Sequence, residues 1–353
     1  KREAAPLYNT MKKCGDTTVV HHEMFSNGID YLRILFDIRD MEIKDLPYVG
    51  ILKYILGYMD TERYGFSELA NEINIHTGGI SASCGVYPHV KKPEDMQFMF
   101  ELRVKTLASE LPQAMDLLRE IIAQLRSRVE AAFDGSGHSV ASMRALSYFS
   151  RAAYYQEATA GISFYELVAD LDEHFNEKKD ALIAQLEKMV QTIFVPERMI
   201  VSVVCEEADY QAVEAQIAFL LKNLYPSKKI VKERSLPELH LEKKNEGFMD
   251  ASQVQYVARA GNYVRHGFSY HGALRILKVI MGYDYLWINV RVKGGAYGCM
   301  NSYMRNGDTY FVSYRDPNLK KTDEIYDGIP QYLAHFKADE REMTKYIIGT
   351  ISD

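Results

Sequence analysis

A repeated order of landmarks limits the fold of this chain more than any other feature. Residues 51–58 read ILKYILGY, and residues 276–283 read ILKVIMGY. Each copy follows an expected strand and precedes an Ile-Asn pair with an apolar neighbour (73–75 and 288–290), a Gly-Gly pair and an alternating strand. The offset is 225 residues at the helix (276 − 51) and 216 at the glycines (294 − 78). Two apolar helices can match by chance, but the shared order of landmarks predicts an internal duplication.

The duplication predicts an α+β protein with two related domains. Between residues 226 and 247 the sequence PSKKIVKERSLPELHLEKKNEG carries many charges, two prolines and little periodicity, which is typical of a linker. The predicted domains are therefore 1–228 and 247–353, joined by a linker at 229–246. The first copy continues far beyond its helix, and the second runs only to Asp353, so we expect the second copy to be truncated.

Hydrophobic periodicity predicts the elements within each copy. Residues 29–40 (IDYLRILFDIRD) alternate apolar and polar side chains and indicate a half-buried strand. Residues 1–16 are charged and irregular and are expected to form a connector. In the second copy, 272–287 is expected to be a helix, and 288–304 (INVRVKGGAYGCMNSYM) is expected to form a strand, a glycine loop and a second strand.

Composition excludes several classes of function. Hydrophobic residues make up 47% and charged residues 25% of the 353 residues, which is ordinary for globular domains. The net charge of -6 argues against a nucleic-acid-binding protein, which needs a basic surface. The four cysteines (Cys14, Cys84, Cys205, Cys299) are far apart and form no CxxC pair, so we expect buried free thiols in a reducing compartment.

Membrane and targeting signals are also missing from the sequence. No apolar run approaches the roughly 20 residues that span a bilayer, and the start shows no signal-peptide pattern. The chain begins without Met and ends within a helical pattern, so both ends are expected to be cuts in a longer protein. A bacterial-type cytoplasm is the favoured location and an organelle matrix is the alternative.

Arg291 and Tyr297 are the candidate functional residues. They flank the glycines of the segment RVKGGAYG, and glycine allows sharp turns and a close approach to a ligand. Arginine presents a rigid fork of donors, and tyrosine presents one hydroxyl on a rigid ring. Held together, these two side chains have the donors needed to grip a peptide carbonyl. The alternative is a plain hairpin turn with a surface arginine and a packed tyrosine.

Four blocks in order resemble the C-terminal half of the pitrilysin/insulinase zinc metallopeptidases, in particular the presequence-protease (falcilysin-like) subfamily. The blocks are 20–32, 46–80, 137–171 and 272–298, the last reading GALRILKVIMGYDYLWINVRVKGGAYG. The resemblance runs from about Val20 to Asp353. It implies a clamshell-shaped enzyme in which each half consists of two similar α/β rolls, with helices packed on an antiparallel-rich sheet.

The zinc motif of this family, H-x-x-E-H on a helix, does not occur in the sequence, and neither does H-E-x-x-H. Glu173 and His174 have Asp170 where the first histidine of the motif should stand. His21 and His22 are adjacent near a strand, where neighbouring side chains point to opposite faces, so they cannot bind one ion together.

The helix after Gly50 resembles a decayed copy of the zinc-binding helix. The family's His, Glu and His correspond here to Lys53, Leu56 and Gly57. A lysine is charged at neutral pH, and leucine and glycine offer no donor atom. The remaining histidines show no ligand spacing, so we expect no metal and no other cofactor in this chain.

The resemblance also implies a function. The missing N-terminal half of the same polypeptide would bind zinc and carry the glutamate base, and this chain would close over it. Tyr297 and Arg291 match the family positions that contact carbonyls of a short, unfolded peptide substrate. Neither nucleic acid nor membrane is an expected partner. The alternative is a non-catalytic binding or assembly module, like the inactive core subunits related to this family.

Overall fold

The computed structural model describes residues 9–56, 61, 63–89, 92–123, 137–226, 234–249 and 253–352. The chain divides into two compact units, each built from separated segments. Unit 1 consists of Lys1–Tyr87, Gln97–Ala131 and Ser163–Glu238, and unit 2 consists of Pro88–Met96, Ala132–Ile162 and Leu239–Asp353. One division between the units falls inside the segment expected to be a linker, and residues 234–249 contain neither helix nor strand. The domain limits 1–228 and 247–353 remain a prediction of how the duplication divides the chain.

Among the described residues of unit 1, six strands form a mixed sheet in the order β1-β2-β6-β3-β5-β4. The β2–β6 pair is parallel, and the β1–β2, β3–β6 and β3–β5 pairs are antiparallel. The strands are β1 (Thr10–Cys14), β2 (Thr17–Glu23), β3 (Ile29–Asp37), β4 (Ile80–His89), β5 (Lys92–Leu107) and β6 (Met199–Cys205).

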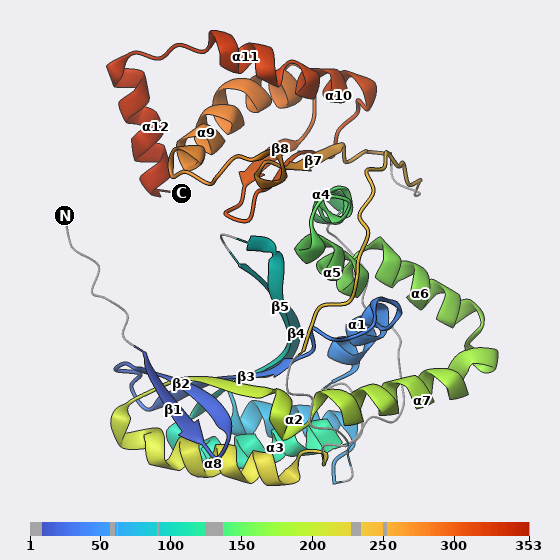
Figure 1. Ribbon diagram of the computed structural model, residues 1–353, viewed down its shortest axis with the longest axis vertical. Helices are drawn as coiled ribbons and strands as arrows, with labels where there is room; N and C mark the ends of the chain where they lie inside the picture. Colours follow the sequence, from blue (N-terminus) through green and yellow to red (C-terminus); the bar gives the residue numbers. More distant parts are fainter. Residues whose placement is uncertain are drawn as a thin grey trace. The chain divides into compact units, whose positions relative to one another are not determined.

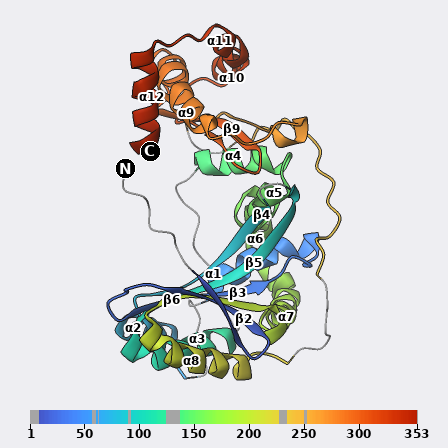
Figure 2. The same cartoon turned by 60° about the vertical axis from the view of Figure 1, so that its left-hand side comes forward.

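The core of unit 1 lies on one face of this sheet. In β6, every second residue from Met199 to Cys205 is buried, and β3 buries Leu32, Ile34 and Phe36 in the same two-residue period. The ring of Phe194 packs edge-on against Phe36, with the ring centroids 5.0 Å apart. Helices α2, α3 and α8 lie side by side on the sheet in both ribbon views (Figures 1 and 2). The helices of this unit are α1 (Leu46–Ile55), α2 (Phe66–His76), α3 (Leu111–Ala123), α6 (Ile162–Glu173), α7 (Phe175–Ile193) and α8 (Tyr210–Asn223).

Unit 2 contains a smaller sheet, in which the described strands β7 (Ala258–Asn262), β9 (Asp308–Tyr314) and β8 (Gly298–Tyr303) pair antiparallel in that order. Its core is formed by residues from the helices and strands of this unit, among them Met281, Leu286, Val290, Ala296 and Tyr326. The helices are α4 (Gly137–Ser147), α5 (Arg151–Ala160), α9 (Ala273–Ile280), the π-helix η6 (Met281–Val292), α10 (Lys320–Asp327), α11 (Ile329–His335) and α12 (Glu340–Ser352).

The two units share a topological core, which confirms the prediction of two related α/β domains. Unit 1 runs β3, α1, α2, Gly-Gly, β4, β5, and unit 2 runs β7, α9, η6, Gly-Gly, β8, β9. The sheet orders β3-β5-β4 and β7-β9-β8 are equivalent. In each unit the strand that follows the glycines (β4 or β8) lies at the edge, and the strand after it in sequence (β5 or β9) lies between that edge strand and the strand that precedes the helices (β3 or β7). Among the described residues of unit 2, no strand corresponds to β1, β2 or β6 of unit 1.

Two predictions of local structure are wrong. Residues 10–14 form β1, because pairing with β2 supplies the backbone hydrogen bonds that an irregular connector lacks. Residues 288–292 continue the helix as part of η6 rather than forming a strand. Their β-branched residues favoured a strand, but Leu286 and Val290, four positions apart, both face the core, and burial of this helical stripe overrides local propensity.

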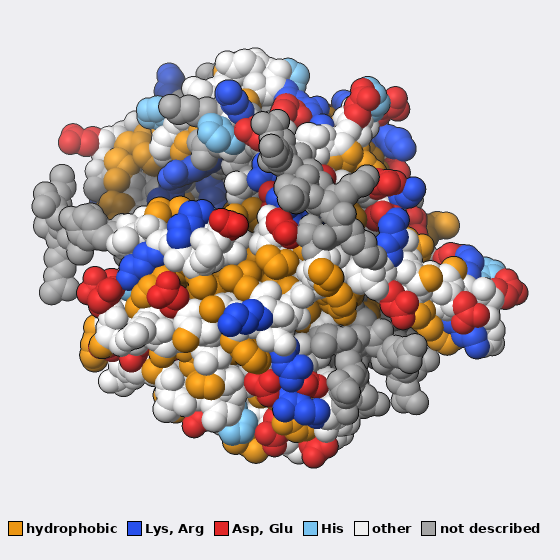
Figure 3. Space-filling model, turned by 60° about the horizontal axis from the view of Figure 1, so that its bottom comes forward, with side chains coloured by type: hydrophobic (Ala, Val, Ile, Leu, Met, Phe, Trp, Pro, Cys, Tyr) orange, Lys and Arg blue, Asp and Glu red, His pale blue; other side chains and the backbone are white. Residues whose placement is uncertain are grey.

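The surface carries charges of both signs. On the face drawn in Figure 3, basic and acidic side chains are interspersed over the described residues. None of the helices in the described part of the chain is long and apolar enough to cross a bilayer. All four cysteines are free thiols.

Candidate functional site

Arg291 lies in the last turn of η6, where it stacks on the only tryptophan of the sequence. The guanidinium carbon lies 4.3 Å from the ring centroid of Trp287, within the range of a cation–π interaction. Trp287 precedes Arg291 by four residues, so the helical winding places both side chains on one face. The backbone N–H of Lys293 donates to the carbonyl of Ile288 at 3.0 Å, which is the i to i+5 pattern of a π-helix.

Two glycines make the turn from η6 into β8. A Cβ at Gly294 would collide with the carbonyl oxygen of Val290, so this position has no room for a side chain. Gly295 has φ of +85°, a conformation that side-chain-bearing residues adopt only under strain. The backbone N–H of Gly295 donates to the carbonyl of Arg291 at 2.8 Å and ties the loop to the end of the helix.

The end of β9 and the segment after it hold the glycine loop from the other side. The backbone N–H of Tyr297 donates to the carbonyl of Tyr314 at 3.0 Å, and the side-chain amide of Asn318 donates to the carbonyl of Gly294 at 2.5 Å. Asn318 is positioned in turn by Asp316, a fully buried carboxylate that accepts from the Asn318 backbone N–H at 2.8 Å and from the Thr322 hydroxyl at 2.7 Å. The loop therefore has a fixed backbone.

Tyr297 presents its hydroxyl to solvent from this fixed backbone. The side chain is 64% exposed, and its ring packs edge-on against Tyr314 with the centroids 5.8 Å apart. Within the described residues its hydroxyl has no hydrogen-bond partner. Arg291 lies beside it: the guanidinium donates from Nη1 to the Tyr297 carbonyl and lies 5.4 Å from the Tyr297 ring centroid. Two donor side chains thus meet on one exposed surface.

The chemistry of this site is that of donors rather than nucleophiles. Burial raises the pKa of the nearby Cys299 thiol to about 11, although the charge of Arg291 opposes that shift. The thiol is therefore protonated near neutral pH and a poor nucleophile. The arrangement is suited to stabilising negative charge on an oxygen atom brought to it.

The sequence pointed to Arg291 and Tyr297, and the structure brings them together. Their contact with a substrate stays a prediction. Sequence analysis missed Trp287, Tyr314 and Asn318. The Trp-x-x-x-Arg spacing was a usable signal for Trp287, but it has meaning only within one helix, and the predicted helix ended at Trp287 with Arg291 in a predicted strand.

Comparison with known proteins identifies the chain. Residues 1–171 match the family model for the region associated with subfamily C of the M16 peptidases, and residues 245–353 match the "PreP C-terminal domain" model. The chain is 39% identical to protein HypA of Clostridium perfringens over 99% of its own length, and 30% identical to presequence protease 1 of Arabidopsis thaliana over 95% of it. The chain belongs to the peptidase M16 family. Within that family it resembles the C-terminal part of presequence proteases.

This M16 chain spans about a third of the length of these curated relatives, 37% of HypA and 32% of the plant protein. Solved structures show the same fold at low sequence identity. A peptidase M16 inactive domain from Pseudomonas fluorescens matches with a TM-score of 0.57 and 14% identity, covering 97% of this chain and 82% of that one. A protease from Helicobacter pylori matches with a TM-score of 0.56 and 13% identity, covering 98% and 85%.

The described residues of this M16 chain do not fit a catalytic zinc ion. Among the described residues, no group of three or more His, Cys, Asp or Glu side chains is arranged to hold a metal. Lys53 is half-buried and burial lowers the pKa of its ammonium, Leu56 is buried, and Gly57 lies outside the described residues. His21 and His22 are in β2; His21 contacts Cys205 and His22 contacts Ser202. No catalytic step is therefore assigned to a metal in this chain.

Proposed function

We propose that this chain is the C-terminal half of a zinc-dependent endopeptidase that degrades short, unfolded peptides. The observation that supports this most directly is the pair of donors at the glycine loop. Tyr297 offers an exposed hydroxyl on a clamped backbone, and Arg291 is stacked on Trp287 beside it. In the matching positions, the M16 resemblance implies contact with substrate carbonyls.

The chemistry of peptide hydrolysis explains why these two donors are useful. Attack on the scissile carbonyl builds negative charge on its oxygen, and a donor already aimed at that position lowers the barrier without reorganisation. The Tyr297 hydroxyl donates to this oxygen, and Arg291 holds a neighbouring carbonyl of the peptide. Neither side chain is a base or a nucleophile near neutral pH.

The partner that this function requires is the N-terminal half of the same polypeptide. In the proposal that half holds zinc, which supplies an activated water and polarises the carbonyl, and it also holds the glutamate base. The 353-residue chain closes over the other half and binds no cofactor. The favoured location is a bacterial-type cytoplasm.

The test compares the full-length polypeptide with the 353-residue chain. We expect the full-length protein to contain stoichiometric zinc by elemental analysis and to cleave an unstructured fluorogenic peptide until EDTA is added. We expect the isolated chain to be metal-free and inactive. EDTA-sensitive cleavage by the isolated chain would contradict the proposal.

The same experiment addresses the alternative of a non-catalytic module. A full-length protein that folds, lacks an upstream H-x-x-E-H motif and binds no zinc would be such a module. In that case substitution of Tyr297 would have no activity to change.

A further inference from the structure

A hollow in unit 2 is lined by cationic and phenolic side chains, and none of its lining residues belongs to the glycine loop. Its volume is about 440 Å³, and its lining residues come from α9 and the segment before it, from the end of β8 and from the turn after β8. They are Tyr270, Leu274, Arg275, Lys278, Ser302, Tyr303, Met304 and Arg305. Three of these eight residues are basic and none is acidic.

The two arginines of the hollow have no acidic partner. Among the described residues, no ion pair involves Arg275 or Arg305. Arg305 lies with its guanidinium carbon 5.6 Å from the ring centroid of Tyr270, which is on the same lining. The neighbouring Arg265, by contrast, pairs with Glu94 at 2.9 Å. The two arginines therefore bring to the hollow positive charge that no described acidic side chain pairs with.

The turn that carries Arg305 is rigid. The backbone N–H of Gly307 donates to the carbonyl of Met304 at 3.0 Å, and the Tyr263 hydroxyl donates to the same carbonyl. Below the turn, the buried Asn306 side chain donates to Asp308 at 2.7 Å.

Asp308 is the acidic residue nearest to this turn in the sequence, but it is directed away from Arg305. Its carboxylate accepts from the side chains of Asn262 at 2.8 Å and Asn306 at 2.7 Å and is only 3% exposed. A buried carboxylate with these bonds holds the turn in shape and leaves the Arg305 charge available to a ligand.

The wall of the hollow that α9 forms is bonded to β8, the strand that leads into the Arg305 turn. The Asn301 side-chain amide of β8 donates to the backbone carbonyl of Lys278 on α9 at 3.2 Å. This bond ties the last turn of α9 to β8, so Arg275 on α9 and Arg305 in the turn after β8 are carried by elements that are already joined before binding. Such preorganisation lowers the entropic cost of capturing a charged group.

We propose that this hollow binds the carboxylate of an acidic peptide side chain. Arginine forks match the planar two-oxygen geometry of a carboxylate, and Tyr270 and Tyr303 provide phenolic walls for the aliphatic part of a glutamate. As a subsite for substrate, this inference rests on the proposed function. Tyr303 lies at the end of β8 and Tyr297 just before its start, six residues apart, which is about 20 Å in an extended strand. An extended peptide bridges that distance with about six residues.

The binding experiment does not depend on catalysis. The probe is acetyl-Gly-Glu-Glu-Gly-amide, titrated calorimetrically into the full-length polypeptide with EDTA present, and the matched peptide carries Gln in place of both Glu residues. We expect the double variant Arg275→Gln/Arg305→Gln to bind the Glu peptide at least about tenfold more weakly, because each lost charge-assisted bond is worth that much or more. The Gln peptide should bind weakly to both proteins.

The control variant is Lys320→Gln/Arg341→Gln, which removes two exposed positive charges from the same unit. It should bind the Glu peptide like the wild type. Equal loss in both variants, or equal binding of the Glu and Gln peptides, would overturn the proposal. A second titration uses inorganic phosphate as the probe. If phosphate binds and the Glu peptide does not, the hollow is a site for free anions, and the peptide assignment is overturned.

Kinetics then separate this inference from the proposed function. In the full-length enzyme, a fluorogenic peptide with Glu six residues from the cleaved bond should have a lower KM than its Gln counterpart, and Arg275→Gln/Arg305→Gln should abolish the difference without lowering kcat. If no peptide is cleaved at all, the proposed function fails while the calorimetric result still stands.

Discussion

The junction between helix and strand occurs twice in this molecule, with the same backbone device and different side chains. In unit 1, α2 leads through Gly78 and Gly79 into β4, and Gly79 has φ of +124°. In unit 2, η6 leads through Gly294 and Gly295 into β8, and Gly295 has φ of +85°. In both copies the second glycine takes a conformation that disfavours any other residue.

The side chains around the two junctions diverge. Counting from the glycines, Tyr297 corresponds to the exposed Ser81 and Arg291 to Ile75, which is 67% exposed. Counting from the Ile-Asn pair, Arg291 corresponds to His76. The two counts differ by one residue where the second copy is wound as a π-helix, a form that takes more residues per turn than the α-helix.

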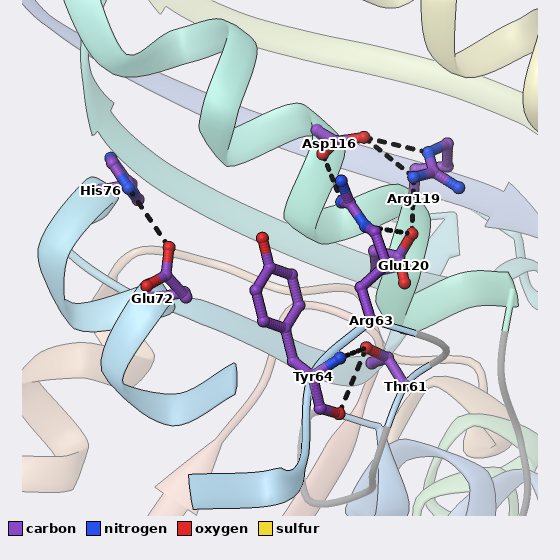
Figure 4. Close-up of polar contacts among 8 residues, drawn as sticks. All are labelled: Thr61, Arg63, Tyr64, Glu72, His76, Asp116, Arg119 and Glu120. Atoms are coloured by element: carbon purple, nitrogen blue, oxygen red, sulfur yellow. Dashed lines mark hydrogen bonds and ion pairs between the residues drawn. The ribbon is translucent and has the colours of Figure 1, made fainter. Parts of the chain in front are cut away.

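Ionisable side chains near the first junction are paired with one another (Figure 4). His76 lies between Glu110, 2.8 Å from its Nδ1, and Glu72, 3.4 Å from its Nε2. Arg63 pairs with Glu120 at 2.9 Å and also with Asp116. At the second junction the Tyr297 hydroxyl is instead exposed, and Arg291 lies beside it, bonded to the Tyr297 carbonyl and stacked on Trp287. The glycine turn occurs in both copies, and the proposed substrate donors lie at the second one.

The largest effect that this comparison predicts is for Tyr297→Phe. Phenylalanine keeps the ring and its packing on Tyr314 and removes only the hydroxyl. We expect turnover of the full-length enzyme to fall by about 10²–10³ with KM little changed, because one transition-state donor is lost. Ser81→Ala, the matched change in unit 1, should leave turnover unchanged. Steady-state kinetics on a fluorogenic peptide, with Tm as the folding check, measure both. Near-wild-type turnover of a folded Tyr297→Phe enzyme would remove this hydroxyl from the chemistry.

Arg291→Ala should raise KM and lower kcat together, since Arg291 is assigned to a carbonyl that is bound before and during reaction. A loss of about tenfold to a hundredfold in kcat/KM is expected for one charge-assisted bond. In the 353-residue chain the same change should shift the emission of Trp287, the only tryptophan, because the stacked cation is gone. Ile75→Ala serves as the control and should alter neither. Unchanged emission would contradict the stacking.

The two units also differ in how their buried carboxyl groups are bonded. Asp30 in β3 is completely buried, and neither of its oxygens has a hydrogen-bond partner among the described residues. Burial, aided by the charge of Asp209, raises its pKa from 3.8 to about 6. The folded state therefore keeps a proton that the unfolded chain releases, so stability falls as pH rises from about 4 through 6.

Asp30→Asn should remove that pH dependence. We expect it to raise Tm relative to the wild type at pH 7.5 but not at pH 3.5, with an upper limit of about 3 kcal/mol in the free energy of unfolding. Asp316→Asn in unit 2 should show no such gain, because Asp316 already accepts two hydrogen bonds. A Tm difference between Asp30→Asn and wild type that is the same at both pH values would refute the assignment.

The smallest expected effects come from the glycines themselves. Gly79→Ala and Gly295→Ala meet no steric obstacle, but both force alanine into positive φ. Each should lower the free energy of unfolding by about 1–2 kcal/mol, measured by denaturant titration. Only Gly295→Ala should also reduce peptide cleavage, since it displaces Tyr297. Equal loss of activity in both variants would show that the two junctions do not differ in function.

Several features followed from the sequence because they depend on local order. The repeated landmarks predicted two related α/β units, and the period-two alternation of residues 29–40 predicted β3. The conjunction of glycines with Arg291 and Tyr297 marked the candidate site, since glycine at positive φ is a local backbone requirement.

Other features were decided only by tertiary packing. Residues 288–292 (INVRV) alternate β-branched and polar residues, yet they are helical because Leu286 and Val290 both pack into the core. The stacking of Arg291 on Trp287 depends on that winding, and the clamp from Asn318 depends on a segment more than 20 residues away. Residues 10–14 become a strand only because β2 supplies partners for their backbone. Burial of apolar surface and pairing of backbone groups are properties of the whole fold, so no local pattern specifies them.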